Sequence, residues 1–185
     1  MRFADIIGNA SVVKALASMA DSGRVAHAML LYENEGCGAL ALAMAYLQYL
    51  NCSNRSGGDS CGECPSCRQM SKLIHPDVHY VFPVNKGPKT SDDKPTSESY
   101  IKYWRELALA NPYFTEADLQ RAIGIESKNG LIAVAEAKTP TSPIRTNNLF
   151  IILYFAAKIA NIFDKTAFHR ALDCYIRSED TLFNT

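Results

Sequence analysis

Residues 28–50, AMLLYENEGCGALALAMAYLQYL, decide the fold that the sequence predicts. The run Ala28–Tyr32 is short and apolar, which is typical of a buried parallel strand. A glycine-containing turn follows at 33–38, and Ala39–Leu50 then has almost no polar residue, which indicates a helix buried on most sides. Strand, glycine turn and buried helix in this order predict an α/β domain of the nucleotide-binding type, built on a parallel sheet.

The turn at 33–38 departs from a working phosphate-binding loop, which reads G-x-x-x-x-G-K-[S/T]. The lysine and the hydroxyl of that motif contact phosphate and Mg²⁺, and losing a charged hydrogen-bond donor alone costs about 1.5–3 kcal/mol. Carboxylates in the turn would also repel a triphosphate. We therefore predict an incomplete P-loop that serves as scaffold, with no ATP and no catalytic residue; the alternative is an ordinary glycine turn. The motif positions are held by Glu33, Gly36, Gly38, Ala39 and Leu40.

A cluster of four cysteines follows the predicted buried helix, with the spacing C-x8-C-x2-C-x2-C. Thiolate sulfurs prefer zinc to hard cations, and glycines between them permit the tight turns of a tetrahedral site. Because four sulfurs close the coordination sphere, we predict a structural Zn²⁺ and not a catalytic one. A redox dithiol and an iron–sulfur cluster are the alternatives. The predicted ligands are Cys52, Cys61, Cys64 and Cys67.

Several single residues have simpler interpretations. Cys37 and Cys174 have no ligand-like neighbours in the sequence and are predicted to be core thiols. His75 is predicted to be a hydrogen-bonding residue at a strand edge, and Trp104 a core contact of its own helix. Basic residues beside the cysteine cluster either offset the charge of four thiolates or are ordinary solvated charges; they are Arg55, Arg68 and Lys72.

Composition excludes several classes of protein. The chain has 185 residues, enough for one domain with an insertion. Lys+Arg 19 balances Asp+Glu 19, so no overall field attracts nucleic acid or anionic lipid. The longest apolar stretch, Leu149–Phe163, is too short to span a bilayer, and Asp5 interrupts any leader-like segment. These features predict a cytoplasmic protein with no membrane partner, in a reducing compartment that suits metal ligation by cysteine.

The predicted organisation has four parts along the chain. Residues 1–84 form the N-terminal part of the α/β domain, with the zinc module at 51–68. Residues 85–99 contain no hydrophobic residue and are predicted to be a flexible polar insertion. A helical continuation at 100–138 and an atypical helical tail at 139–185 complete the chain. The other predicted elements are helices at Ser11–Asp21, Cys64–Leu73, Tyr100–Asn111 and Thr115–Gly124, and a second strand at Val78–Val84. Asp118, three residues after Thr115, predicts a capping box there, and the apolar run Leu131–Ala137 could start a helix or a strand.

A combination of motifs over Met1–Val84 resembles one bacterial family. The altered P-loop and the four-cysteine insertion are joined by Asp5-Ile6-Ile7-Gly8, by the approach Gly23–Ala28 to the first strand, and by His75-Pro76-Asp77 before the second. Together these motifs are similar to those of the DNA polymerase III clamp-loader subunits, and most closely to subunits of delta-prime type.

The resemblance carries expectations about fold and function. It implies the AAA+ fold and a structural zinc held by the four cysteines. Ala39 and Leu40 stand where ATP-hydrolysing gamma/tau subunits have Lys and Thr, which favours the non-hydrolysing delta-prime type. The implied partners are gamma/tau and delta subunits, and the sliding clamp and primed DNA through the complex. The alternatives are a gamma/tau-like ATPase and a small zinc-ribbon module that binds nucleic acid directly.

Overall fold

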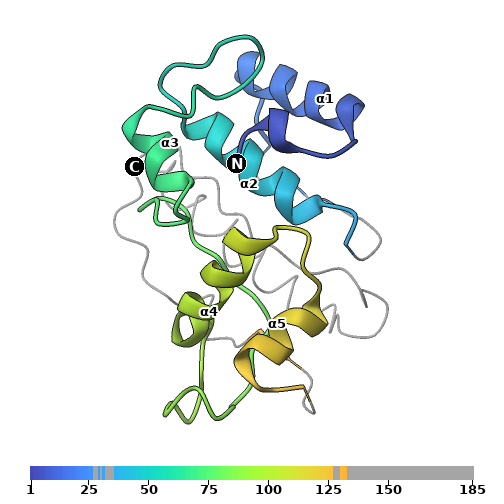
Figure 1. The fold of residues 1–185 in the computed structure, drawn as a ribbon. Helices are drawn as coiled ribbons and strands as arrows, with labels where there is room; N and C mark the ends of the chain where they lie inside the picture. The colour runs from blue at the N-terminus through green and yellow to red at the C-terminus, as the bar shows by residue number, and fades with distance from the viewer. Residues whose placement is uncertain (27–28, 30, 32–35, 127–129, 133–185) are drawn as a thin grey trace, which may run out of the picture. The chain divides into compact units, whose positions relative to one another are not determined.

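The computed structural model describes residues 1–26, 29, 31, 36–126 and 130–132, all within one compact unit, Met1–Phe155. The regular structure of these residues is helical (Figure 1). A 3-10 turn precedes a series of α-helices. The elements are η1 (Phe3–Asp5), α1 (Ala10–Asp21), α2 (Ala39–Asn51), α3 (Pro65–Met70), α4 (Ser97–Ala110) and α5 (Glu116–Ile123).

Each predicted helix within the described residues is confirmed. The helix ends follow local chemistry. Helix α4 ends just before Asn111, which precedes a proline, and proline cannot continue a helix. Before α5, Thr115 Oγ1 accepts from the Asp118 amide at 3.2 Å while Asp118 Oδ2 accepts from the Thr115 amide at 2.9 Å. This reciprocal capping box is the one that the sequence predicts, and Gly124 ends the helix with φ 77°.

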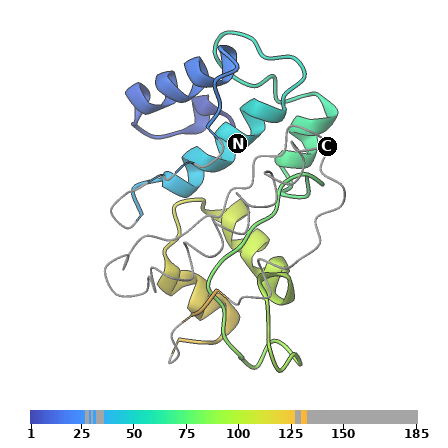
Figure 2. The same cartoon turned by 180° about the vertical axis from the view of Figure 1, so that it is seen from behind.

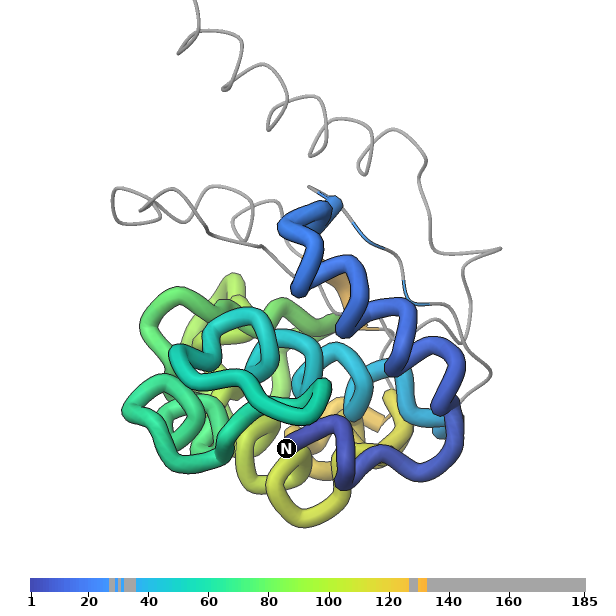
Figure 3. Tube along the Cα trace, turned by 90° about the horizontal axis from the view of Figure 1, so that it is seen from above, coloured from blue at the N-terminus to red at the C-terminus, as the bar shows by residue number. Residues whose placement is uncertain are grey.

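Helix α2 is the centre of the hydrophobic core. Every residue from Leu40 to Tyr49 is buried, so the prediction of a helix buried on most sides is confirmed. One set of its side chains, including Tyr46, packs with Phe3 of η1 and Leu16 of α1. The opposite set, including Met44, packs with residues from α3, α4 and α5. Figure 3 shows α1 and η1 beside α2.

An aromatic cluster fills the second half of the core. Trp104 of α4 is 1% exposed, and its ring lies 4.4 Å from Tyr80, 5.7 Å from Phe82 and 6.3 Å from Phe114, centroid to centroid. Trp104 is therefore a core residue, as predicted. Aromatic pairs at these separations contribute about 0.5–1.5 kcal/mol each beyond the area they bury.

The prediction of a second strand at Val78–Val84 is wrong, because the segment forms no ladder of hydrogen bonds with another strand among the described residues. Alternate residues of the segment are buried, as a strand pattern requires, but within the described part of the chain only Val84 pairs, in one antiparallel bridge to Leu131. The backbone of Phe82 bonds instead to the Ser97 hydroxyl, at 2.9 Å from its N–H and 3.1 Å from its carbonyl. A side chain thus satisfies the groups that a neighbouring strand would take. Figure 2 shows this segment between α3 and α4.

No sheet is present among the described residues, so the predicted parallel sheet is not seen there. The first predicted strand, Ala28–Tyr32, lies mostly outside the described residues, as do most of 131–137 and the tail from 139. Among the residues that the structure describes, no helix is long and apolar enough to cross a membrane.

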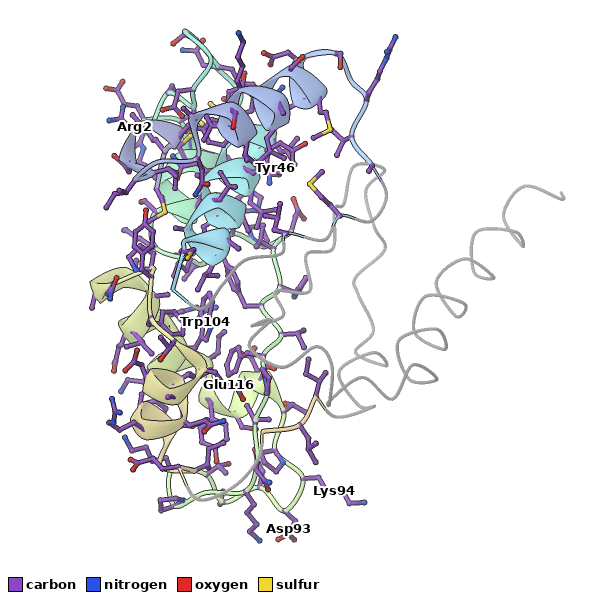
Figure 4. The ribbon with its side chains drawn as sticks, turned by 90° about the vertical axis from the view of Figure 1, so that its right-hand side faces the viewer. Arg2, Tyr46, Asp93, Lys94, Trp104 and Glu116 are labelled. Carbon is purple, nitrogen blue, oxygen red and sulfur yellow. The ribbon has the colours of Figure 1, made fainter. Side chains whose placement is uncertain are left out.

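The polar segment, residues 85–96, is held by contacts with α4, which follows it in the chain, and with α5. The Tyr100 hydroxyl accepts from the Gly87 amide and donates to the Asn85 carbonyl, both at 3.0 Å. Lys89 Nζ donates to the carbonyl of Ala122 at 2.6 Å, and its charge lies 4.6 Å from the centre of the Tyr103 ring. Figure 4 shows the tip of the segment, with Asp93 and Lys94 labelled. The flexibility predicted for 85–99 stays a prediction, although α4 begins within that range.

Candidate metal centre and the glycine turn of α2

Four sulfur atoms converge where the sequence predicts a metal site. The sulfurs of Cys52, Cys61, Cys64 and Cys67 lie within 4.8 Å of one another. The separation between the first two is 3.5 Å, and Cys61 and Cys67 are 3.9 Å apart, far longer than a disulfide bond. A tetrahedral ion with metal–sulfur bonds of about 2.3 Å holds its sulfurs about 3.8 Å apart. The group could therefore hold a metal ion.

Backbone amides surround these sulfurs. Cys52 Sγ accepts from the amides of Asn54 and Cys61, at 3.4 and 3.3 Å. Cys61 Sγ accepts from the Cys64 amide and Cys64 Sγ from the Cys67 amide, both at 3.4 Å. An N–H donor stabilises a thiolate more than a thiol, so this pattern favours the ionised form that binds metal.

The amides also change how the thiols titrate. Burial opposes ionisation of Cys64, but hydrogen bonds from the Cys67 and Ser53 amides outweigh it and lower the pKa to about 5. For Cys61, amide bonds from Glu63 and Cys64 lower the pKa. Burial and the neighbouring thiols raise the pKa of Cys67. The surroundings thus favour the thiolates of Cys64 and Cys61, whereas burial disfavours the thiolate of Cys67.

Local turns bring the cysteines together. The amide and carbonyl of Ser56 exchange hydrogen bonds with those of Asp59, at 3.1 and 3.0 Å, around Gly57 and Gly58. Both glycines have positive φ, 60° and 77°, which a two-residue hairpin turn of this kind requires. Pro65 then opens α3 directly after Cys64, whose sulfur caps the helix.

The cysteine loop, Cys52–Cys67, is tied to the start of the chain. The carboxylate of Asp59 accepts from the amides of Phe3 and Ala4, at 3.0 and 2.9 Å. Buried Gln48 of α2 donates to the Ser60 hydroxyl and accepts from the Met1 ammonium, both at 3.0 Å. The loop therefore connects η1 with the central helix.

Basic residues near the loop have partners other than sulfur. Arg55 donates to the carbonyl of Leu50 at 2.8 Å and lies 5.0 Å from the centre of the Tyr49 ring. The Arg68 guanidinium donates to the Glu63 carbonyl at 2.7 Å, and Lys72 is exposed. The interpretation as ordinary surface charge fits these contacts better than direct compensation of the thiolates.

Two other predictions concern single residues. The prediction that Cys37 is a core thiol is wrong, because its side chain is exposed in the turn before α2; Cys174 lies outside the described residues. His75 is buried, and its Nδ1 accepts from the Asp77 amide at 3.2 Å. Burial lowers the pKa of His75, so the ring is neutral and serves a hydrogen-bonding role, although at no strand edge.

The glycine turn of α2 is described from Gly36 onward, and Glu33 lies outside the described residues. Gly36 and Gly38 have φ of 78° and 101°, a conformation that favours glycine. Ala39 is half-buried, and Leu40 is 6% exposed in the same core cluster as Trp104. Leu40, predicted from the sequence to stand at the hydroxyl position of a P-loop, is therefore a core side chain.

Sequence reasoning missed one residue at this turn. Tyr113, between α4 and α5, lies against Gly38, and its hydroxyl accepts from the Ile7 amide at 3.0 Å. No local pattern signals such a contact, because the two bonded residues are 106 positions apart.

Comparison with known proteins gives a family and several relatives. The family model described as "DNA polymerase III, delta subunit" matches residues 8–153, which extends well past the motifs that end at Val84. DNA polymerase III subunit delta' of Yersinia pestis is 47% identical over 66 residues, 36% of this chain and 19% of that protein. The delta' subunit of Escherichia coli is 39% identical over 69 residues, 37% of this chain and 20% of that protein.

Relatives of a second type match nearly as well. DNA polymerase III subunit gamma of Buchnera aphidicola is 36% identical over 76 residues, 41% of this chain and 21% of that protein. This chain thus spans about a fifth of the length of these curated relatives. No solved structure matches.

Proposed function

The chain belongs to the DNA polymerase III delta-subunit family, and on this premise we propose that it is a non-catalytic clamp-loader subunit of delta-prime type. Such a subunit is a cytoplasmic scaffold: it presents a surface to ATP-hydrolysing gamma/tau subunits and helps them, with a delta subunit, to load the sliding clamp at primed DNA. The observation that carries the proposal is the pair Ala39 and Leu40 at the start of α2.

The surroundings of Ala39 and Leu40 support a scaffold role. Leu40 packs in the core with Met44, and a threonine there would leave a hydroxyl among apolar side chains. Ala39 offers no cation to a phosphate, and one charged hydrogen bond is worth about 1.5–3 kcal/mol. The start of α2 is thus built for packing and lacks the groups that bind ATP and Mg²⁺.

The four-cysteine group supports a structural zinc as the single cofactor of this proposal. The sulfur separations of 3.5 and 3.9 Å agree with the tetrahedral value of about 3.8 Å. All four positions of the ion would be filled by Cys52, Cys61, Cys64 and Cys67, so no site remains for activated water. When bound, zinc supplies a fixed crosslink and no reaction chemistry.

Three measurements on the purified chain test the proposal together. Metal analysis is expected to give one zinc per chain, whereas iron with inorganic sulfide would favour the cluster alternative. Mg-ATP is expected to leave the melting temperature unchanged, because a ligand that binds the native state must raise it. Gel filtration is expected to show co-elution with gamma/tau and delta subunits.

A gamma/tau-like ATPase is the second candidate, and the 36% identity to a gamma subunit favours it. It predicts an ATP-dependent rise in melting temperature and phosphate release that depends on Mg²⁺. Direct nucleic-acid binding by a zinc-ribbon module predicts instead an affinity for DNA that falls steeply with salt. Either result would overturn the scaffold proposal.

A further inference from the structure

We propose that Tyr113 covers Gly38, the last residue before α2, and fastens it to the N-terminal segment at Ile7. Its ring faces Gly38, and its hydroxyl is bonded to the backbone of Ile7. Three segments far apart in the sequence meet at this one side chain: the stretch before α1, the turn before α2, and the turn between α4 and α5.

The ring lies directly on Gly38. A Cβ added to Gly38 would lie 2.6 Å from Tyr113 Cε1, closer than non-bonded carbon atoms approach one another, and 3.3 Å from Cδ1, which is a tight contact. A Cβ added to Gly36 would instead meet the Tyr113 carbonyl oxygen at 3.8 Å, an ordinary contact. The absence of a side chain at Gly38 is therefore what allows the ring to reach the turn.

The hydroxyl end makes a long-range backbone contact. The Ile7 amide donates to Tyr113 Oη at 3.0 Å. The Ile7 side chain is 76% exposed and contributes little burial of its own. This hydrogen bond therefore holds Ile7 in place where apolar packing does not.

The backbone around Tyr113 is itself fixed. The side-chain carbonyl of Asn111 accepts from the Tyr113 amide at 3.0 Å, and the Phe114 amide donates to the Asn111 carbonyl at 3.3 Å. Pro112 restricts its own φ at the next position of this turn. Phe114 is buried against Trp104 in the core. Little conformational freedom is therefore left to lose when the ring lies on Gly38.

The contact lies at Gly38, the residue before α2, and does not depend on the residues at Ala39 and Leu40. Free N–H groups at the start of a helix attract anions where the backbone is open to solvent. Here an aromatic ring covers the glycine that precedes the helix. The Tyr113 contact at Gly38 is thus separate from the loss of the binding groups, which comes from Ala39 and Leu40.

Hydrogen exchange on the nucleotide-free chain tests the hydroxyl contact. Tyr113→Phe removes the acceptor and keeps the ring, so the Ile7 amide is expected to exchange on the order of tenfold faster while the Gly36–Ala39 amides are unchanged. Tyr113→Ala is expected to speed exchange at both places. Tyr103→Phe on α4 is the matched control and changes neither. Unchanged exchange at Ile7 in both Tyr113 variants would overturn the proposal.

A double-mutant cycle tests the ring contact. Gly38→Ala and Gly36→Ala both force an alanine into positive φ, but only the former meets the ring. The drop in melting temperature caused by Gly38→Ala is expected to shrink by about half in the Tyr113→Ala background, because the clash is gone. The drop caused by Gly36→Ala is expected to be the same in both backgrounds. Equal drops for Gly38→Ala with and without Tyr113 would contradict the proposed cover.

Both experiments are independent of the proposed delta-prime role. They are done without nucleotide and measure the contacts of Tyr113 with Ile7 and Gly38. ATP hydrolysis by the chain would therefore overturn the proposed function and leave the Tyr113 contact unaffected. A double-mutant cycle without coupling between Tyr113 and Gly38 would overturn the contact and leave the proposed function unaffected.

Discussion

The cysteine loop and the polar segment are both poor in apolar residues, yet they are held in different ways. In the cysteine loop, four sulfurs converge on one point within 4.8 Å. In the polar segment, separate bonds from Tyr100 and Lys89 hold one end. A loop with one shared anchor gains or loses its order as a unit, whereas a loop with several anchors loses it piece by piece.

The largest effect is expected from removing one anchor of the cysteine loop. Cys64→Ser should abolish tight zinc binding, whose free energy is on the order of 10 kcal/mol or more in small zinc modules and is coupled to folding. Amide protection should be lost across 52–67 and kept at 85–96. Metal content and hydrogen exchange measure both effects.

Cys37→Ser is the matched control for this substitution, because Cys37 is an exposed thiol outside the loop. It should keep one zinc per chain. A zinc content unchanged by Cys64→Ser would mean that the four cysteines do not act together.

The next largest effect is expected from a fall in pH, to which the two loops should respond differently. A thiol whose pKa is lowered in the folded state, like Cys64 at about 5, stabilises the protein above its unfolded pKa, and this contribution is lost as pH falls through the folded value. Protons also compete with metal for the thiolates. The cysteine loop should therefore release zinc as the pH falls toward 5, while the polar segment keeps its protection.

Zinc release can be followed with a chromophoric chelator in a pH series, and exchange at 85–96 in the same samples. Loss of protection in both loops at the same pH would show global unfolding and remove the distinction.

A smaller effect is expected from Tyr100→Phe, which deletes the hydroxyl shared by Asn85 and Gly87. Leaving these backbone groups without their partner should cost about 1–3 kcal/mol. Urea unfolding measures the loss, and exchange should rise near Gly87 only. Tyr103→Phe is the matched substitution on the same helix. A change in zinc affinity in Tyr100→Phe would contradict the independence of the two loops.

The smallest effect is expected at the surface of the polar segment. Lys86 pairs with Asp93 there, and both side chains are largely exposed. Exposed ion pairs contribute about 0–1 kcal/mol, so Lys86→Met should barely move the urea midpoint, and less at high salt. A loss of several kcal/mol would place Lys86 among the anchors of the segment.

The parts of the fold that the sequence predicts well are those that depend on local chemistry. The capping box of Thr115 and Asp118, the apolar run of α2 and the spacing of the cysteines each concern residues close together in the chain. The predicted strand at Val78–Val84 has the right alternation, but its hydrogen bonds depend on Ser97, whose role no local pattern encodes. The prediction of a core thiol at Cys37 was wrong for another reason: it rested on the lack of ligand-like neighbours in the sequence, but Cys37 lies in an exposed turn before the buried helix.

The residues of the candidate site also differ in whether the sequence predicts them. The cysteine group could be predicted from its spacing, because a tight turn at Gly57 and Gly58 and the start of α3 bring the sulfurs together. Tyr113 and Asp59 could not, because each bonds a backbone amide more than fifty positions away. Such contacts are decided by tertiary packing and leave no periodic signal.

Helix α2 has no solvent-facing side between Leu40 and Tyr49. Each residue of an α-helix is rotated by about 100° from the one before it. Deleting one residue in the middle of α2 would therefore rotate all later side chains by about 100°, away from the neighbours that they contact. A frame-preserving deletion there should be as harmful as losing the helix, whereas the same deletion at the exposed tip near Asp93 should be tolerated.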